Sequence, residues 1–199
     1  NSLNIKNISL KNVSTYQENY ITDAIKGAMS QTYSHLEIII SDDCSSDSTY
    51  KIATEMVKNY NGPHHIILNK NKKNLGLVVH VNTALSLASG EIFVAAAGDD
   101  ISLPSRVSST VQLFEKYPTA SFVSFNDIVI DEHGAKVSKS PRVKSKEDKE
   151  YQFTDFIAGS TLPFSGASRA LNMSVYKNYE PLSSDCPTED TPMIIRGLL

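Results

Sequence analysis

Cysteine is scarce in this sequence of 199 residues, and several signals of particular protein classes are missing altogether. The two cysteines, Cys44 and Cys186, stand far apart in polar segments, so neither a disulfide framework nor a four-ligand zinc pattern is present. No hydrophobic run approaches the length of a membrane span, and the first residues lack the charged-then-apolar layout of a signal peptide. These absences predict a cytoplasmic protein without a transmembrane segment.

Excess positive charge and glycine-rich phosphate loops are missing as well. The formal net charge is −3, so no basic field attracts nucleic acid, and we expect no nucleic-acid partner. Neither a GxGxxG nor a GxxxxGKS/T motif occurs, which argues against an ordinary dinucleotide or ATP site. The length fits one domain with a substantial hydrophobic core.

Strand-like and helix-like segments alternate over the first 120 residues. Strands are expected at 8–13, 36–41, 65–68 and 92–97, and helices with one apolar stripe at 21–29, 52–60, 78–88 and 107–114. This alternation predicts an α/β fold of the doubly wound type, with a mainly parallel sheet and right-handed crossovers.

The pattern changes after residue 120. Strand-like residues at 121–125 and 127–130, with a turn before 136–138, indicate a small antiparallel hairpin. Residues 139–150 are mostly charged or polar and predict a mobile, solvated loop. A helix is expected at 170–176, and another begins near Thr191. We therefore divide the single domain into an α/β half, residues 1–120, and a second half, residues 121–199.

Four polar clusters stand out, namely 14–17, Asp42-Asp43, Asp99-Asp100 and Glu189-Asp190. The first three follow predicted strands directly, and the carboxyl ends of parallel strands meet at one edge of a sheet. Taken alone, the Asp99-Asp100 pair is better explained as a solvated turn, with Asp100 or Ser102 capping the next helix. Three clusters on one edge predict a ligand site.

Carboxylates at such an edge repel an anionic ligand unless a cation lies between them. Mg²⁺ and Mn²⁺ accept oxygen ligands and bridge to phosphate, so Asp99 or Asp100 suits a metal-bound diphosphate. Asp42 or Asp43 suits a hydrogen bond to a base or ribose. A nucleoside diphosphate handled through a metal, without a phosphate loop, indicates nucleotide-sugar chemistry.

The same residues carry a resemblance to a known family. The sequence resembles the family 2 inverting glycosyltransferases of the GT-A fold, in order and over almost its whole length. The matching motifs lie at 15–21, 28–33, 37–43 with Ser45 and Asp47, 74–76, 90–91 and 98–106, and at 188–190.

The resemblance implies a nucleotide-sugar donor, usually a UDP-sugar. Ser14 and Tyr16 would line the nucleotide pocket, Asp43 would hold the uracil, and Asn74 belongs to the same donor-binding set. Asp99 would lie near the ribose and diphosphate.

The resemblance also implies a metal and a catalytic base. Asp100 would bind Mn²⁺ or Mg²⁺, and Asp190 would accept a proton from the acceptor hydroxyl. The second half of the chain, with 165–168 in the acceptor wall, would receive a saccharide or glycolipid acceptor in cell-envelope polysaccharide synthesis. A glycolipid acceptor extends the expected location to the inner face of the cell membrane.

Departures from the family pattern keep other readings open. Gln17 replaces a frequent Asn, and Ala97 stands where a full Asp-x-Asp motif has its first Asp. A nucleotide-sugar-binding pseudo-enzyme is therefore one alternative, and a sugar nucleotidyltransferase is another, although its basic glycine-rich loop is missing. A phospho-receiver domain would leave Asp190 and the hairpin without a role.

Overall fold

The computed structural model describes residues 16–34, 36–137, 147–159 and 168–199, and the backbone of 8–14. The strands are β1 (Ile8–Ser14), β2 (Glu37–Asp42), β3 (His65–Lys70), β4 (Ile92–Ala97), β5 (Phe122–Ser124) and β6 (Arg169–Asn172). The longer helices are α1 (Ile21–Met29), α2 (Thr49–Lys58), α3 (Leu77–Leu87), α4 (Arg106–Lys116) and α7 (Asp190–Leu198). The short helices are α5 (Phe153–Ile157) and α6 (Ser174–Lys177).

The described strands form one sheet in the order β3-β2-β1-β4-β6-β5. β1 lies in the middle and pairs in parallel with β2 and β4, and β3 pairs in parallel with β2. β6 runs antiparallel to both β4 and β5. The α/β prediction, with a mainly parallel sheet and a small antiparallel part, is confirmed.

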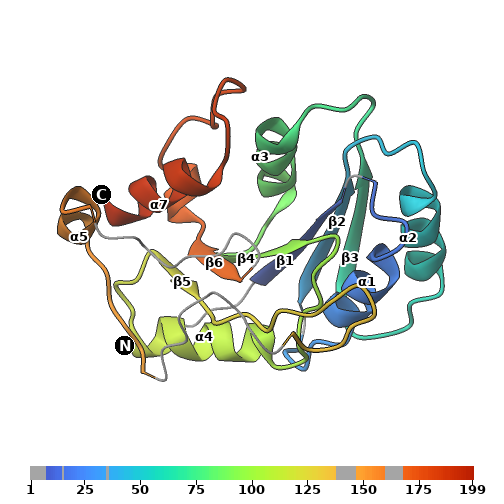
Figure 1. Cartoon of the computed structure of the whole chain (residues 1–199), viewed down its shortest axis with the longest axis horizontal. Coiled ribbons are helices and arrows are strands. Elements are labelled where there is room, and N and C mark those ends of the chain that lie inside the picture. Colours follow the sequence, from blue (N-terminus) through green and yellow to red (C-terminus); the bar gives the residue numbers. More distant parts are fainter. Residues whose placement is uncertain (1–7, 15, 35, 138–146, 160–167) are drawn as a thin grey trace.

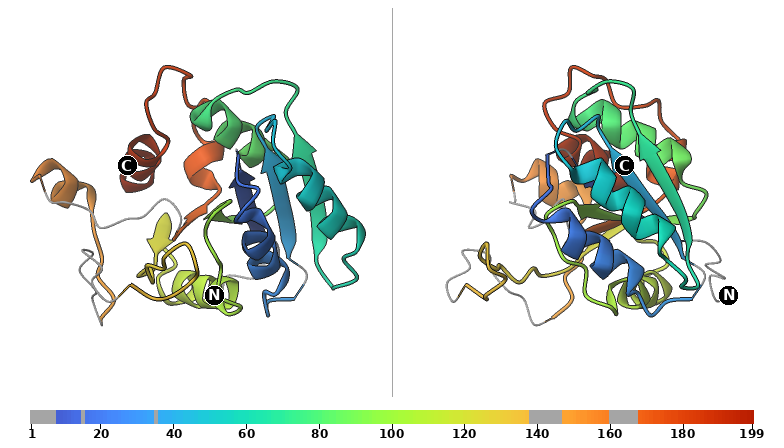
Figure 2. Two further views of the ribbon diagram at one scale, coloured as in Figure 1. Left: turned by 45° about the vertical axis from the view of Figure 1, so that its right-hand side comes forward. Right: turned by 90° about the vertical axis from the view of Figure 1, so that its right-hand side faces the viewer.

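Helices cover both faces of this sheet (Figure 1; Figure 2). Ile38 and Ile40 point into a core under α1, α2 and α4, whereas Ile39 between them points into a second core under α3 and α7. Successive strand side chains alternate between faces, so a strand buried on both sides is apolar at every position. The unbroken run Ile38–Ile40 is therefore the sequence signal of a central strand.

The parallel strands end at one common edge. Ser14 at the end of β1 pairs with Asp42 at the end of β2, and Val13 pairs with Ala97 at the end of β4. Asp42 in turn pairs with Lys70, the last residue of β3. The loops that follow these strands therefore leave the sheet side by side, as the polar clusters predicted.

One local prediction is wrong, and a second is confirmed only in part. Residues 170–176 are not a continuous helix, because Ala170 and Leu171 are buried between β4 and β5 as part of β6, and only then does α6 begin. The predicted hairpin after β5 is present in a short form: Ile130 and Lys136 form an antiparallel bridge, and the N–H groups of Asp131 and Val137 donate to the carbonyls of Ala135 and Val129, both at 2.9 Å. The alternative explanation of the acidic turn, a helix cap by Asp100 or Ser102, is not supported, because α4 begins at Arg106 with Ser105 at its N-cap.

Other predictions stay untested. The charged loop 139–150 lies mostly outside the described residues, as does most of the segment 165–168. The division into halves at residue 120 also stays a prediction, although β5 and β6 join the same sheet as β1–β4. Among the described residues, no helix combines the length and the apolar character that a bilayer crossing requires.

Candidate functional site

The second cluster begins with a buried carboxylate that shapes its own turn. Asp42, 1% exposed, accepts a hydrogen bond of 2.9 Å from the Ser45 backbone N–H and another from the Ser45 hydroxyl. Cys44 between them has a positive φ of 61°, so the chain turns sharply here. Asp42 and Asp43 were the two candidates for a contact with a base or ribose. The carboxylate of Asp42 is already hydrogen-bonded within its own turn.

Asp43 ties down the loop that follows β3. Its carboxylate, only 2% exposed, accepts hydrogen bonds from the backbone N–H groups of Leu75 and Gly76, both at 2.9 Å. The side-chain amide of Asn71 donates a third, at 2.7 Å. Asn74, predicted to contact the donor, is exposed in this loop, and its Oδ1 accepts a hydrogen bond from Gly76 at 3.0 Å. The sheet edge and the 71–76 loop therefore act as one rigid unit.

A buried histidine completes this network. His80, 1% exposed, lies on α3 with its Nδ1 2.8 Å from the Asn71 amide nitrogen and its Nε2 3.1 Å from the Ser41 carbonyl. Because an amide nitrogen only donates and a carbonyl only accepts, this pattern fits a neutral imidazole with its proton on Nε2. The histidine thereby fixes the orientation of Asn71 toward Asp43.

The first cluster rests on the second. The Tyr16 backbone N–H donates to Ser45 Oγ at 3.1 Å, and the Gln17 N–H donates to Thr49 Oγ1 at 2.8 Å. Tyr16 has a positive φ of 57°, and its ring is 56% exposed at the sheet edge. Ser14 belongs to this edge through its backbone pairing with Asp42. An exposed aromatic ring beside a polar turn is suited to stacking on a planar ligand.

The third cluster presents two exposed carboxylates, Asp99 and Asp100, just beyond the end of β4. Arg106 lies behind them, and its guanidinium donates to Ser102 Oγ at 2.9 Å and to the Ala95 carbonyl. Burial lowers the pKa of Arg106 to about 10, against the opposing pull of the nearby carboxylates, including Asp100. The acidic turn is therefore backed by a fixed positive charge.

These carboxylates fit a metal that arrives with its phosphate ligand. Within the described residues no group of three or more His, Cys, Asp or Glu side chains gathers as a ready-made cage. Mg²⁺ and Mn²⁺ do not need such a cage, since they keep waters and commonly bind through one or two carboxylates plus substrate phosphates. Asp99 and Asp100 are two exposed carboxylates of the kind that such a site uses.

The fourth cluster reaches the same side of the molecule through an unpredicted residue. Asp190 begins α7, and its carboxylate forms an ion pair with Arg169, the first residue of β6. Val94 pairs with Ala170, so in this antiparallel pair Arg169 is one residue nearer to the carboxyl end of β4. Arg169 therefore holds Asp190 toward the edge that carries the other clusters.

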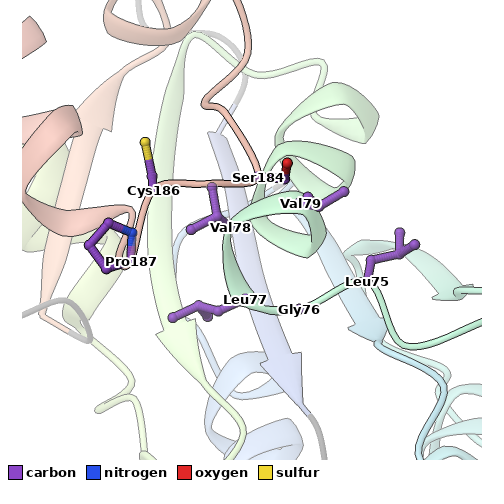
Figure 3. Close-up of a pocket in the computed structure, with 8 residues that line it drawn as sticks. All are labelled: Leu75, Gly76, Leu77, Val78, Val79, Ser184, Cys186 and Pro187. Atoms are coloured by element: carbon purple, nitrogen blue, oxygen red, sulfur yellow. The ribbon is translucent and has the colours of Figure 1, made fainter.

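A small open pocket lies between the loop after β3 and the segment before Asp190 (Figure 3). Its lining comprises Leu75, Gly76, Leu77, Val78 and Val79 on one side and Ser184, Cys186 and Pro187 on the other. Asn82 of α3 holds the second segment in place, because its side chain exchanges hydrogen bonds of 2.8 and 3.2 Å with the backbone of Leu182. The segment leading to Asp190 is thus anchored beside the Asp43-bound loop.

Sequence reasoning missed the residues that position the clusters. Arg169 went unnoticed because the segment that follows it was read as a helix, and its partner lies 21 residues away in the sequence. Asn71 and His80 looked like ordinary loop and helix residues, and only tertiary structure brings them to Asp43.

Comparison with known sequences decides the family. The model of glycosyl transferase family 2 matches residues 12–179, most of the chain. The chain belongs to glycosyl transferase family 2. It is 28% identical over 179 residues to EpsE of Bacillus subtilis, which is named as a glycosyltransferase. The match covers 90% of this chain and 62% of EpsE, so the chain spans about three fifths of that relative's length.

Solved structures share the fold at low sequence identity. TarS of S. aureus, residues 1–349, matches with a TM-score of 0.70 and 15% identity, over 96% of this chain and 54% of that one. TarS is also known in complex with UDP-GlcNAc. The mannosyltransferase PcManGT of Pyrobaculum calidifontis, in complex with GDP-Man and Mn²⁺, matches with a TM-score of 0.71 and 18% identity, over 96% and 52%.

Proposed function

We propose that this protein transfers a sugar from a nucleotide-sugar donor, a UDP-sugar, to a hydroxyl group of an acceptor, with inversion at the anomeric carbon. The observation that carries the proposal is the common edge at which β1, β2 and β4 end, each followed by one of the polar clusters. Family membership supports the reaction class. The acceptor is a saccharide or glycolipid of the cell envelope, and the protein acts in the cytoplasm or at the inner face of the membrane.

Donor binding is assigned to the first three clusters. The exposed ring of Tyr16 stacks on the base, beside the backbone of Ser14. Asp43 holds the uracil, either directly or through the 71–76 loop that it anchors, with Asn74 exposed in that loop. Asp99 lies at the ribose and diphosphate. The structures of TarS with UDP-GlcNAc and PcManGT with GDP-Man support nucleotide-sugar binding by this fold.

Asp100 holds Mn²⁺ or Mg²⁺ in this proposal. When bound there, the cation would neutralise the negative charge that grows on the departing diphosphate. Without it, the carboxylates of Asp99 and Asp100 would repel the diphosphate, because all of these groups are anionic. Ala97 offers no further carboxylate, so the remaining ligands of a bound cation would have to come from the diphosphate and water.

Asp190 acts as the general base. The acceptor hydroxyl attacks the anomeric carbon, the bond from that carbon to the diphosphate oxygen breaks, and the proton of the hydroxyl passes to the Asp190 carboxylate. Attack from the face opposite the leaving group inverts the configuration. Proton transfer to a positioned base contributes typically ~10²–10⁴-fold in rate.

The test combines nucleotide binding with turnover. Thermal shifts are measured with UDP, GDP and ADP, each with and without Mn²⁺, and nucleotide release is then followed from UDP-GlcNAc, UDP-glucose and GDP-mannose. We expect UDP to stabilise most, with linkage adding about 2.7 kcal/mol at one hundred times its dissociation constant. Equal stabilisation by the three diphosphates would contradict the preference for uracil. If no nucleotide is released from any donor, the proposed transfer activity is contradicted.

One structural observation favours a second candidate, a donor-binding protein without turnover. Ala97 leaves the acidic turn with one carboxylate fewer than a full Asp-x-Asp motif. This candidate predicts Mn²⁺-dependent binding of UDP with no release of UDP from any sugar nucleotide, even with a saturating mixture of saccharide acceptors. A single turnover that depends on Asp190 excludes it.

A further inference from the structure

Arg169 is buried at a place where a charged side chain needs a partner. It opens β6, pairs with Ser124 of β5, and is 5% exposed. Removing a guanidinium from water costs several kcal/mol unless an anion and hydrogen bonds compensate it. Whatever Arg169 contacts is therefore held firmly, since the burial is tolerable only while the contact persists.

Its partner is one residue, gripped at two points. Nη2 of Arg169 is paired with Oδ1 of Asp190, and Nη1 lies 3.3 Å from the main-chain oxygen of the same residue. The two contacts fix both the start of α7 and the direction of the Asp190 side chain. A guanidinium suits this task, because its nitrogens are fixed in one plane and can reach two acceptors together.

The two contacts with Arg169 leave Oδ2 of Asp190 available to a ligand. The side chain of Asp190 is 44% exposed although that of Arg169 is 6% exposed, so the pair points its anionic end outward. No group in the described part of the chain donates to Oδ2 of Asp190. Glu189, the neighbouring residue, has a buried Oε2 with no hydrogen-bond partner among those same residues.

We propose that Arg169 is the positioning residue of the transfer reaction: it holds Oδ1 of Asp190 and thereby aims Oδ2 at the acceptor hydroxyl. The proposal rests on the function proposed above, in which Asp190 accepts the proton. Arg169 touches neither substrate nor metal in this account. It acts through Asp190 alone, and this restriction makes the proposal testable.

The competing explanation is purely structural, with Arg169 serving only to attach α7 to β6. Arg196 offers a matched control on the same helix. Its guanidinium donates to the Glu180 carbonyl at 2.7 Å and lies over the ring of Tyr179, 5.1 Å from the ring centroid. Loss of Arg196 loosens the attachment of α7 without touching Asp190.

The experiment is a kinetic double-mutant cycle on the full-length protein. Arg169→Met, Arg169→Lys, Asp190→Asn, the double variant Arg169→Met with Asp190→Asn, and Arg196→Met are compared. Release of nucleotide from UDP-GlcNAc, UDP-glucose and GDP-mannose with Mn²⁺ gives kcat and KM on whichever donor the wild type turns over. UDP affinity is measured by calorimetry, and melting temperature shows whether each variant is folded.

We expect Arg169→Met to lower kcat by about 10–100-fold, a part of the typical general-base effect, with UDP affinity unchanged within about threefold. In the Asp190→Asn background the same change should cost less than about threefold, because the residue through which Arg169 acts is already disabled. Arg169→Lys should recover part of kcat. Arg196→Met should lower the melting temperature more than it lowers kcat.

Several outcomes would overturn the proposal. One is an Arg169→Met effect of equal size with and without Asp190, and another is an equal loss of kcat in Arg196→Met. If Arg169→Met does not fold, Arg169→Lys alone and combined with Asp190→Asn replaces it in the cycle, and a loss of kcat of equal size with and without Asp190 has the same meaning. A wild type that releases no nucleotide contradicts the proposed function instead. An active Asp190→Asn variant would show that another residue is the general base, and the positioning role of Arg169 would be wrong with it.

Discussion

The carboxylate of Asp43 and the backbone N–H of Gly76 are joined by a hydrogen bond of 2.9 Å across the edge of the sheet. The carboxylate of Asp43 therefore holds the 71–76 loop, although its position at the end of β2 led us to expect a contact with the base of the nucleotide. Both roles are compatible, since a carboxylate has about four acceptor sites and the described residues occupy three of them. In the proposed function, the 71–76 loop and the site for the base are therefore coupled through the side chain of Asp43.

Asp43→Asn should destabilise the protein by about 1–3 kcal/mol. The new amide group would face N–H donors that now meet a carboxylate, so at least one buried donor loses its acceptor. Urea unfolding measures the change. Asp99→Asn is the matched control, because Asp99 is exposed and should leave the free energy of unfolding nearly unchanged. Equal stability of both variants would show that the Asp43 hydrogen bonds contribute little.

Gly27→Ala should disturb the turn that carries Asp99 and Asp100, because Gly27 of α1 packs against the backbone of Ser102. A Cβ at Gly27 would lie 2.8 Å from the Ser102 carbonyl oxygen and 2.9 Å from its nitrogen, both main-chain atoms that cannot rotate away. Overpacking costs about 1–3 kcal/mol, which exceeds the gain of about 1 kcal/mol in helix propensity.

We therefore expect lower stability and weaker Mn²⁺-dependent UDP binding for Gly27→Ala, measured by thermal melting and calorimetry. The exposed neighbour Lys26, changed to Ala, serves as the control on the same helix. A stabilised Gly27→Ala variant would mean that the loop after Asp100 moves freely.

Asp100→Asn should weaken UDP binding in the presence of Mn²⁺ and also lower turnover. The physical reason is loss of the carboxylate that holds the cation, and with it the neutralisation of the diphosphate. Calorimetry with Mn²⁺ and with EDTA separates the effects: chelation should reduce UDP affinity in the wild type and change little further in the variant.

Asp127→Asn is the control for Asp100→Asn. Asp127 also exerts its charge on Arg106, so its removal reproduces the electrostatic effect on Arg106 and leaves both carboxylates of the acidic turn in place. A metal requirement that survives in Asp100→Asn would place the cation on another residue.

Central strands were predictable because burial on both faces leaves an uninterrupted apolar run, as in Ile38–Ile40 and in β4. The common position of the polar residues after those strands was also predictable, because parallel pairing aligns the carboxyl ends of the strands. β6 was not, because Ala170 and Leu171 are too few to show a period, and their burial depends on strands that are distant in sequence.

The positioning residues were beyond sequence reasoning for a related reason. Arg169 and Asp190 are 21 residues apart, and the sequence around either residue does not indicate that the other is its partner. Asn71 and His80 meet Asp43 only after the loop after β3 has folded back on the sheet edge. The sequence thus indicates which chemistry is present, whereas the contacts that orient it come from tertiary structure.

The central claim is that Asp190 removes the proton from the acceptor, and Asp190→Asn tests it most directly. Asparagine keeps the size of the side chain and an oxygen for Arg169, but it cannot take up the proton. Turnover by release of the nucleoside diphosphate should fall on the order of 10²–10⁴-fold. UDP affinity with Mn²⁺, measured on the same samples by calorimetry, should stay within about threefold of the wild type, because Asp190 is not assigned to donor binding. Near-normal turnover of Asp190→Asn with a competent acceptor would contradict the account, and Glu189 would then be the next residue to examine.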